Sequence, residues 1–137
     1  MHILVTGGAG KVGLAVVRWL LAHGHNLRVL DLSAETIQEG VDYRRCDITD
    51  YSSLLPHLDG MDRIIHLAAI PTPMMAPAPE LFHINVAGTF NVFQAAAEAG
   101  IRRIASASSI NTLGYNFGVR PFKLSYFPID EDRKSVV

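Results

Sequence analysis

Residues 2–13 read HILVTGGAGKVG, and this stretch decides the fold of the chain. A short apolar run leads into a glycine-rich turn, and apolar residues at helical spacing follow the turn. The first N–H groups of a helix have no intrahelical partner, and they lie at the positive end of the helix dipole. The stretch therefore predicts a strand, a tight turn and a helix whose N-terminus receives a phosphate or pyrophosphate.

Three glycines of this stretch, Gly7, Gly10 and Gly13, follow the spacing G-x-x-G-x-x-G. They suit a tight turn, a close approach of the backbone to phosphate, and close packing of the helix. A glycine-rich turn without a ligand is the competing interpretation. A P-loop is excluded, because Val12 stands where a Ser or Thr would hold magnesium. Lys11 lies either near the phosphates or in solvent.

Asp31 follows a second apolar run, 27–30. An acid at this position accepts hydrogen bonds from a ribose diol and repels an added 2′-phosphate. We therefore predict a site for NAD, with NADP as the weaker candidate. The alternative is an acid that caps the turn at Ser33. Asp47, expected to end the third strand, also has two interpretations: contact with the adenine amino group, or an acid at a helix N-terminus.

Five apolar runs predict strands, and the stretches between several of them show helical spacing. This alternation is typical of an α/β fold, here a Rossmann-like doubly wound parallel sheet of about five strands. The expected strands are 3–6, 27–30, 41–46, 63–68 and 103–107. The expected helices are 12–23, ended by Gly24; 51–58, capped by Thr49 or Asp50 and disturbed by Pro56; and 80–99, ended by Gly100. Residues 70–79, which hold four prolines, are expected to form a loop.

Length and composition narrow the class of protein. A chain of 137 residues with 49% hydrophobic residues and a net charge of −1 predicts a single soluble domain, 1–137. There is no basic excess, so we expect no nucleic-acid partner. The single Cys46 excludes an internal disulfide and is expected to be buried. Without a signal peptide or a bilayer-length apolar run, we predict a cytoplasmic protein that does not bind membranes.

Small and hydroxyl residues near the ends of the later strands carry further expectations. His66 is expected to be a packed, hydrogen-bonded core residue rather than a catalytic one. Ala68 and Ala69 leave room for a dinucleotide to pass close over the strand end. Ser108 and Ser109 are expected to end the fifth strand, where their hydroxyls either bind a substrate oxygen beside the nicotinamide or satisfy a turn. No spacing of histidines indicates a metal site.

Together these motifs resemble the NAD-dependent epimerase/dehydratase family, the extended short-chain dehydrogenases/reductases. The segments that carry the resemblance are TGGAGKVG at 6–13, Asp31, CDI at 46–48, HLAA at 66–69, NVAGT at 85–89 and ASS at 107–109. The resemblance implies a Rossmann fold and a tightly held NAD. It also implies hydride transfer between the nicotinamide and a sugar-type hydroxyl, often transient, during epimerisation or dehydration.

The resemblance also implies roles for individual residues. It assigns the glycines to the pyrophosphate, Asp31 to the adenosine ribose and Asp47 to adenine. It places Leu67 and the two alanines beside the middle of the cofactor and Asn85 on the helix behind it, and it matches the catalytic hydroxyl to Ser109. The predicted cofactor-binding residues are Gly7, Gly10, Lys11, Val12, Gly13, Asp31, Asp47, Ile48, Leu67, Ala68, Ala69, Asn85 and Ser108.

The chain departs from the family pattern toward its C-terminus. The family's catalytic base is a tyrosine whose pKa is lowered by a lysine four residues later. No tyrosine here has a lysine at that distance: Tyr115 is followed by Val119, and Tyr126 by Asp130. The acidic stretch 128–132 resembles the lead-in to the missing tyrosine. In this part of the chain, a leucine at position 113 also replaces a tyrosine common in the family.

These departures lead to two expectations about function. The first is a truncated cofactor-binding part of an epimerase/dehydratase-like protein, which binds NAD, acts on a small sugar-type substrate only with the missing part, and alone shows no turnover. The alternative is a non-catalytic NAD-binding sensor or interaction protein. Helix 80–99 carries apolar residues around more than one face, so we also expect a homo-oligomer formed through its exposed surface.

Overall fold

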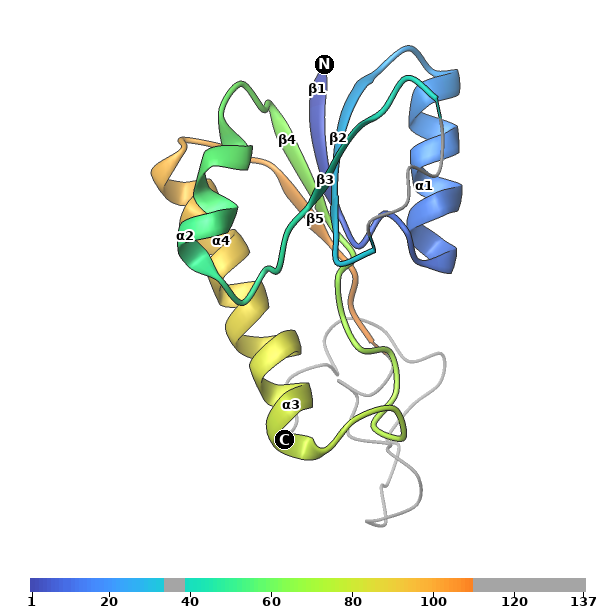
Figure 1. Cartoon of the computed structure of the whole chain (residues 1–137). Helices are drawn as coiled ribbons and strands as arrows, with labels where there is room; N and C mark the ends of the chain where they lie inside the picture. Colours follow the sequence, from blue (N-terminus) through green and yellow to red (C-terminus); the bar gives the residue numbers. More distant parts are fainter. Residues whose placement is uncertain (34–38, 110–137) are drawn as a thin grey trace, which may run out of the picture. The chain divides into compact units, whose positions relative to one another are not determined.

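The computed structural model describes residues 1–33 and 39–109 and divides the chain into two units, Met1–Ser106 and Ala107–Val137. The first unit is built on a five-stranded, all-parallel sheet in the order β3-β2-β1-β4-β5 (Figure 1). The strands are β1 (His2–Thr6), β2 (Asn26–Asp31), β3 (Asp42–Arg45), β4 (Arg63–His66) and β5 (Ile104–Ser106). This confirms the predicted doubly wound α/β sheet.

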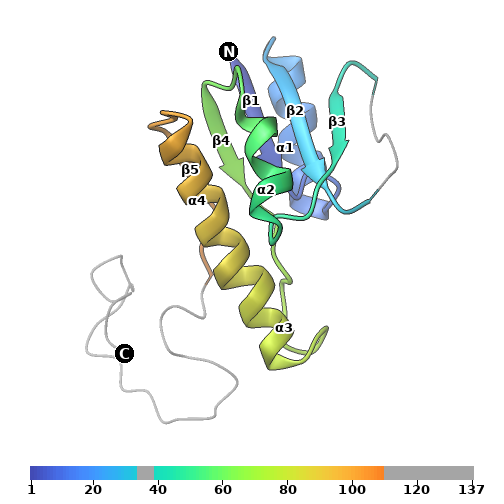
Figure 2. The same ribbon diagram turned by 60° about the vertical axis from the view of Figure 1, so that its left-hand side comes forward.

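Helices cover both faces of the sheet (Figure 2). They are α1 (Lys11–Ala22) on one face, and on the other α2 (Tyr51–Leu54), a 3-10 turn (Leu55–Leu58) and α4 (Thr89–Glu98). The alternation of β1 explains the two layers. Ile3 and Val5 pack into a cluster with Val17 of α1, whereas Leu4 packs into a cluster with Val92 of α4. Each face of β1 therefore meets a different helical layer.

Several strands are shorter than predicted, because each ends where its neighbour ends. Thr6 is in register with His66, and His66 with Ser106, so β1, β4 and β5 end together. Ser108 and Ser109 were expected to end the fifth strand, and that prediction is wrong. Asp47 does not end the third strand either, since β3 ends at Arg45, opposite the last residue of β2.

The predicted helix 80–99 is a composite. It begins two residues earlier as α3 (Ala78–Phe82), continues as a π-helical turn (His83–Gly88) and ends as α4. Pro79 explains the early start, since proline is tolerated in the first turn of a helix. The loop predicted to reach residue 79 therefore ends at Pro77.

Other predicted helix boundaries are confirmed. Gly24 and Gly100 follow α1 and α4 with φ angles of 73° and 72°. Asp50, rather than Thr49, caps α2, where its carboxylate accepts a hydrogen bond from Ser53 N. Pro56 stands in the 3-10 turn that replaces the second half of the predicted helix 51–58.

The stretch 128–132 and the tyrosines at 115 and 126 lie outside the described residues.

Candidate functional site

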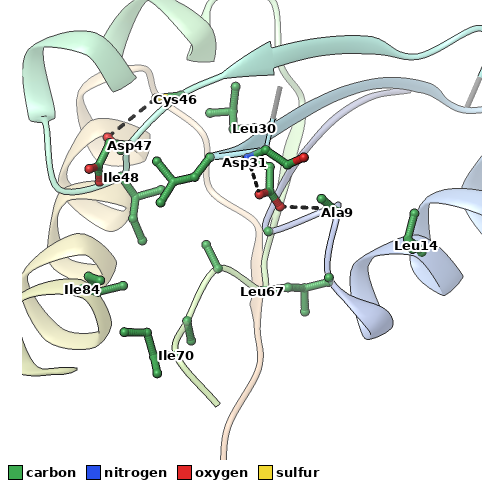
Figure 3. A pocket seen from close by; sticks show the side chains of 16 residues that line it. Ala9, Leu14, Leu30, Asp31, Cys46, Asp47, Ile48, Leu67, Ile70 and Ile84 are labelled. Atoms are coloured by element: carbon green, nitrogen blue, oxygen red, sulfur yellow. Dashed lines mark hydrogen bonds between the residues drawn. The ribbon is translucent and has the colours of Figure 1, made fainter. Parts of the chain in front are cut away.

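A cavity of about 670 Å³ opens at the carboxyl ends of the strands, where the strand order reverses between β1 and β4 (Figure 3). This is where doubly wound sheets bind ligands. The cavity is lined by Gly7, Ala9, Gly10, Leu14, Leu30, Asp31, Leu32, Ser33, Cys46, Asp47, Ile48, Leu67, Ala68, Ala69, Ile70 and Ile84. Eight of the predicted cofactor-binding residues are in this set: Gly7, Gly10, Asp31, Asp47, Ile48, Leu67, Ala68 and Ala69.

The loop Gly7 to Gly10 (the glycine loop) makes the tight turn predicted between β1 and α1. Gly7 has a φ angle of 71°, and its N–H donates to Leu30 O at 2.8 Å. A Cβ on Gly13 would lie 2.2 Å from Gly7 O, which explains why the helix needs a glycine there. Gly10 carries no side-chain cap, so the first turn of α1 keeps N–H groups without an intrahelical acceptor.

Lys11 and Val12 begin α1 but do not line the cavity, and both side chains are exposed. Gly13 is buried beneath the glycine loop and also does not line the cavity. Of these three predicted residues, Gly13 shapes the loop through packing. A phosphate role for the other two stays a prediction.

Asp31 ends β2 and holds two neighbouring backbone segments in place. Its Oδ1 accepts a hydrogen bond from Ser33 N at 3.1 Å, which confirms the turn-capping interpretation. Its Oδ2 accepts one from Ala9 N at 2.9 Å, which ties the carboxylate to the glycine loop (Figure 3). Asp31 is half-buried and lines the cavity, so its carboxylate oxygens are also within reach of a ligand's hydroxyls.

Asp47 lies in the turn between β3 and α2. Its Oδ1 accepts hydrogen bonds from Thr49 N at 2.9 Å and Thr49 Oγ1 at 2.8 Å, and Asp50 provides the helix cap. The carboxylate therefore stabilises the turn ahead of the helix and also lines the cavity beside Ile48. Contact with adenine stays a prediction.

The opposite wall of the cavity is residues 67–70 (the 67–70 segment), which follow β4. Leu67 N donates to Thr6 O at 3.0 Å. At the other end, Ile70 N donates to Asn85 Oδ1 at 2.8 Å and Asn85 Nδ2 donates to Ile70 O at 2.9 Å. Asn85 does not line the cavity. It holds the wall through the backbone of Ile70, from the π-helical turn behind it.

The prediction that His66 is a packed, hydrogen-bonded core residue is confirmed. It is 3% exposed, and burial lowers the pKa of its imidazole below the ordinary value of 6.5. Its ring nitrogens lie 2.7 Å from Thr6 Oγ1 and 2.9 Å from Thr89 Oγ1. Cys46 is also buried, as predicted, and burial raises the pKa of its thiol.

Ser108 and Ser109 belong to the second unit, in which the structure describes only residues 107–109. Both side chains are exposed. Their predicted roles beside the nicotinamide and at the catalytic hydroxyl stay predictions. Within residues 1–33 and 39–109 no helix is both long and apolar enough to cross a bilayer, and no three side chains form a metal-binding group.

Sequence reasoning missed several residues of the cavity. Leu14, Ile70 and Ile84 contribute apolar walls (Figure 3), and Ala9 contributes the N–H that bonds Asp31. Leu14 lies one turn into α1, and its place on the helix face toward the loop could have been read from the helical spacing. Ile84 and Ile70 carry no local signal, because they meet at the cavity only in the folded chain, where Asn85, the neighbour of Ile84, bonds Ile70.

Comparisons with known proteins agree with this geometry. A family model for the NAD dependent epimerase/dehydratase family matches residues 3–129. Sterol demethylase protein B of Methylococcus capsulatus is 35% identical over 120 residues, which are 85% of this chain and 37% of that protein. The NAD-dependent glucose-6-phosphate dehydrogenase of Haloferax volcanii is 35% identical over 118 residues, 82% of this chain and 44% of that protein.

A solved structure is similar over nearly the whole chain. A short-chain dehydrogenase/reductase superfamily protein from Agrobacterium tumefaciens, with bound NAD, superposes with a TM-score of 0.79 at 35% identity. The match covers 97% of this chain and 38% of that one. The chain thus spans about two fifths of the length of the proteins it matches.

Proposed function

Since this chain belongs to the NAD-dependent epimerase/dehydratase family, we propose that it binds NAD in the cavity between the glycine loop, Asp31 and the 67–70 segment. One observation carries the proposal: Asp31, at the end of β2, lines the cavity and is bonded to the glycine loop through Ala9 N. The glycine loop, proposed to bind the diphosphate, and Asp31, proposed to bind the ribose, are therefore held in one fixed arrangement.

The residues present fit the cofactor. Gly10 lines the cavity, and a Cβ there would lie 3.4 Å from Gly7 O, so the glycine keeps the backbone of the loop accessible. The first turn of α1 provides N–H groups and a positive dipole end for the pyrophosphate. Asp31 accepts from the ribose diol, and its charge opposes a 2′-phosphate. Asp47 and Ile48 are proposed to bind the adenine, and Ala68 with Ala69 to leave room for the middle of the cofactor.

The chemistry that NAD supplies is acceptance of a hydride from a carbon that bears a hydroxyl. We propose that the substrate of the protein is a sugar or a nucleotide sugar, as the glucose-6-phosphate dehydrogenase among the relatives supports. The hydroxyl of Ser109 is the proposed partner of the substrate oxygen. Because no tyrosine of this chain has a lysine four residues later, we expect the chain alone to form no NADH with sugars.

Calorimetry on the folded 137-residue chain tests the binding proposal. We expect saturable heat with NAD and at least about tenfold weaker binding of NADP, because a 2′-phosphate beside a carboxylate costs on the order of 1.4 kcal/mol. The Asp31→Ala variant is the matched control, and it should bind the two cofactors with similar affinity. The absence of heat with either dinucleotide, on protein with a native circular dichroism spectrum, contradicts the proposal.

A homo-oligomer formed through residues 80–99 also stays a proposal. Phe82, Val86, Phe90 and Phe93 lie along this composite helix and are between 40% and 65% exposed. An apolar surface of this kind favours association. Sedimentation at rising concentration tests it, and a monomer that persists at high concentration contradicts it.

The expected cytoplasmic location is tested by cell fractionation.

A further inference from the structure

His66 does not line the cavity, yet hydrogen bonds join it to both ends of the 67–70 segment, which does. At the first end, Thr6 Oγ1 lies 2.7 Å from His66 Nδ1 and accepts hydrogen bonds from the N–H groups of Leu67 and Ala68 at 3.3 and 3.4 Å. At the second end, Thr89 Oγ1 lies 2.9 Å from His66 Nε2, and Thr89 is bonded to Asn85, which holds Ile70.

The hydroxyl protons give this chain of hydrogen bonds a single direction. Thr89 donates its only hydroxyl proton to Asn85 O at 2.7 Å, so its oxygen can only accept from His66. The imidazole proton therefore lies on Nε2. In a neutral ring Nδ1 is then an acceptor, and Thr6 donates to it. The order of donation is Thr6 to His66 to Thr89 to the backbone of Asn85.

We propose that His66 is a positioning residue, which couples the two anchors of the 67–70 segment and thereby fixes one wall of the proposed NAD site. The inference rests on the proposed function for its consequence in binding, but not for the hydrogen-bond chain itself. The surroundings of the ring favour this role. Thr6 and Thr89 satisfy both nitrogens, and the ring of Phe93 meets the imidazole edge-on at 6.4 Å between centroids.

The matched pair Thr89→Val and Thr89→Ser tests the coupling without touching the cavity. Valine keeps the shape of threonine and removes the hydroxyl, whereas serine keeps the hydroxyl. We expect amide hydrogen exchange at Ile70 to become about tenfold faster in Thr89→Val, since the hydrogen bond that joins Thr89 to Asn85 is lost. Exchange at Cys46, whose N–H bonds Asp31 O on the other side of the site, should stay unchanged. Thr89→Ser should behave like the parent chain.

Calorimetry on the same variants measures the consequence for binding. We expect the Kd for NAD to rise about tenfold in Thr89→Val and less than about twofold in Thr89→Ser. Thr72→Val is a second control, because it removes a hydroxyl from the same loop outside the hydrogen-bond chain. If the parent chain binds no NAD, the proposed function fails, while the exchange rates at Ile70 still decide whether the coupling exists.

The tautomer of His66 provides a readout that a merely structural role would not set. A long-range ¹H–¹⁵N correlation spectrum of the parent chain at neutral pH should show His66 neutral with its proton on Nε2. A proton on Nδ1, or equal exchange at Ile70 in Thr89→Val and the parent chain, overturns the proposal. Because the spectrum needs no variant, the proposal stays testable even if Thr89→Val fails to fold.

Discussion

The two walls of the cavity are built in different ways. On one side, the glycine loop and Asp31 are held by backbone hydrogen bonds and by one carboxylate, between elements that are close in sequence. On the other side, the 67–70 segment depends on side chains from β1, β4 and the π-helical turn, up to 62 residues away. The first wall is therefore specified locally, and the second depends on the completed fold.

The two walls meet at Gly7, and the largest effect is expected there. A Cβ on Gly7 would lie 2.5 Å from Ala68 N, and the φ angle of 71° is unfavourable for any other residue. Gly7→Ala should lower the free energy of unfolding by more than about 3 kcal/mol, because neither backbone can yield. Urea denaturation measures it. Gly24→Ala is the control, since Gly24 has a similar φ angle in open space and should lose only about 1 kcal/mol.

A substitution of Asp31 tests the first wall, which is formed by the glycine loop and Asp31. Asp31→Ala removes the acceptor for Ala9 N and Ser33 N as well as the proposed ribose ligand. We expect the affinity for NAD to fall about thirtyfold, since hydrogen bonds to a charged group contribute about 2 kcal/mol. Calorimetry with NAD measures this. An unchanged Kd would mean that the carboxylate only holds the loop.

The pH dependence of stability tests the second wall. Burial lowers the pKa of His66, so the unfolded chain takes up its proton first as the pH falls. Stability is fully present above about 6.5, the ordinary pKa of the imidazole, and is lost as the pH falls from there toward the folded pKa. The slope for one proton is at most about 1.4 kcal/mol per pH unit.

His66→Gln should remove most of this slope while it lowers stability at pH 7.5. Urea denaturation at several pH values from 7.5 to about 5 measures both. His57→Gln is the comparison, because burial followed by the charges of Arg28 and Arg44 also lowers the pKa of His57. An equal slope in His66→Gln and the parent chain would show that His66 is not the group responsible.

The smallest effect is expected at Gly88, the last residue of the π-helical turn, which packs against the turn between β3 and α2. A Cβ there would lie 2.7 Å from Ile48 Cδ1 and 2.8 Å from Ile48 Cγ1, and both carbons belong to a flexible side chain. Gly88→Ala should therefore cost only about 1 kcal/mol, and it should cost less still in the background of Ile48→Ala, which removes both contacting carbons. A double-mutant cycle measured by urea denaturation checks this. Full additivity of the two changes would contradict the contact.

The first wall, formed by the glycine loop and Asp31, could be predicted from the sequence. The arrangement of the second wall, the 67–70 segment, could not. Gly7 and Asp31 could be recognised from their spacing in the sequence. Gly7 follows β1 and Asp31 ends β2, and these two strands are separated only by the glycine loop and α1. Asn85 was placed near the cofactor only by resemblance, and its bonds to Ile70 depend on a π-helical turn that the apolar pattern does not reveal. The prediction of the strand ends was wrong for a similar reason. The end of β5 is set by the end of its neighbour β4, and not by the end of its own apolar run.

The position of Trp19 has a practical consequence. It is the chain's single tryptophan, it lies on α1 with 58% of its surface exposed, and its indole stacks on the imidazole of His23 at 3.8 Å. An indole already in water changes its emission wavelength little when the protein unfolds. Intrinsic fluorescence will therefore report the stacking of one ring pair on an outer surface, and denaturation experiments on this protein should rely on circular dichroism instead.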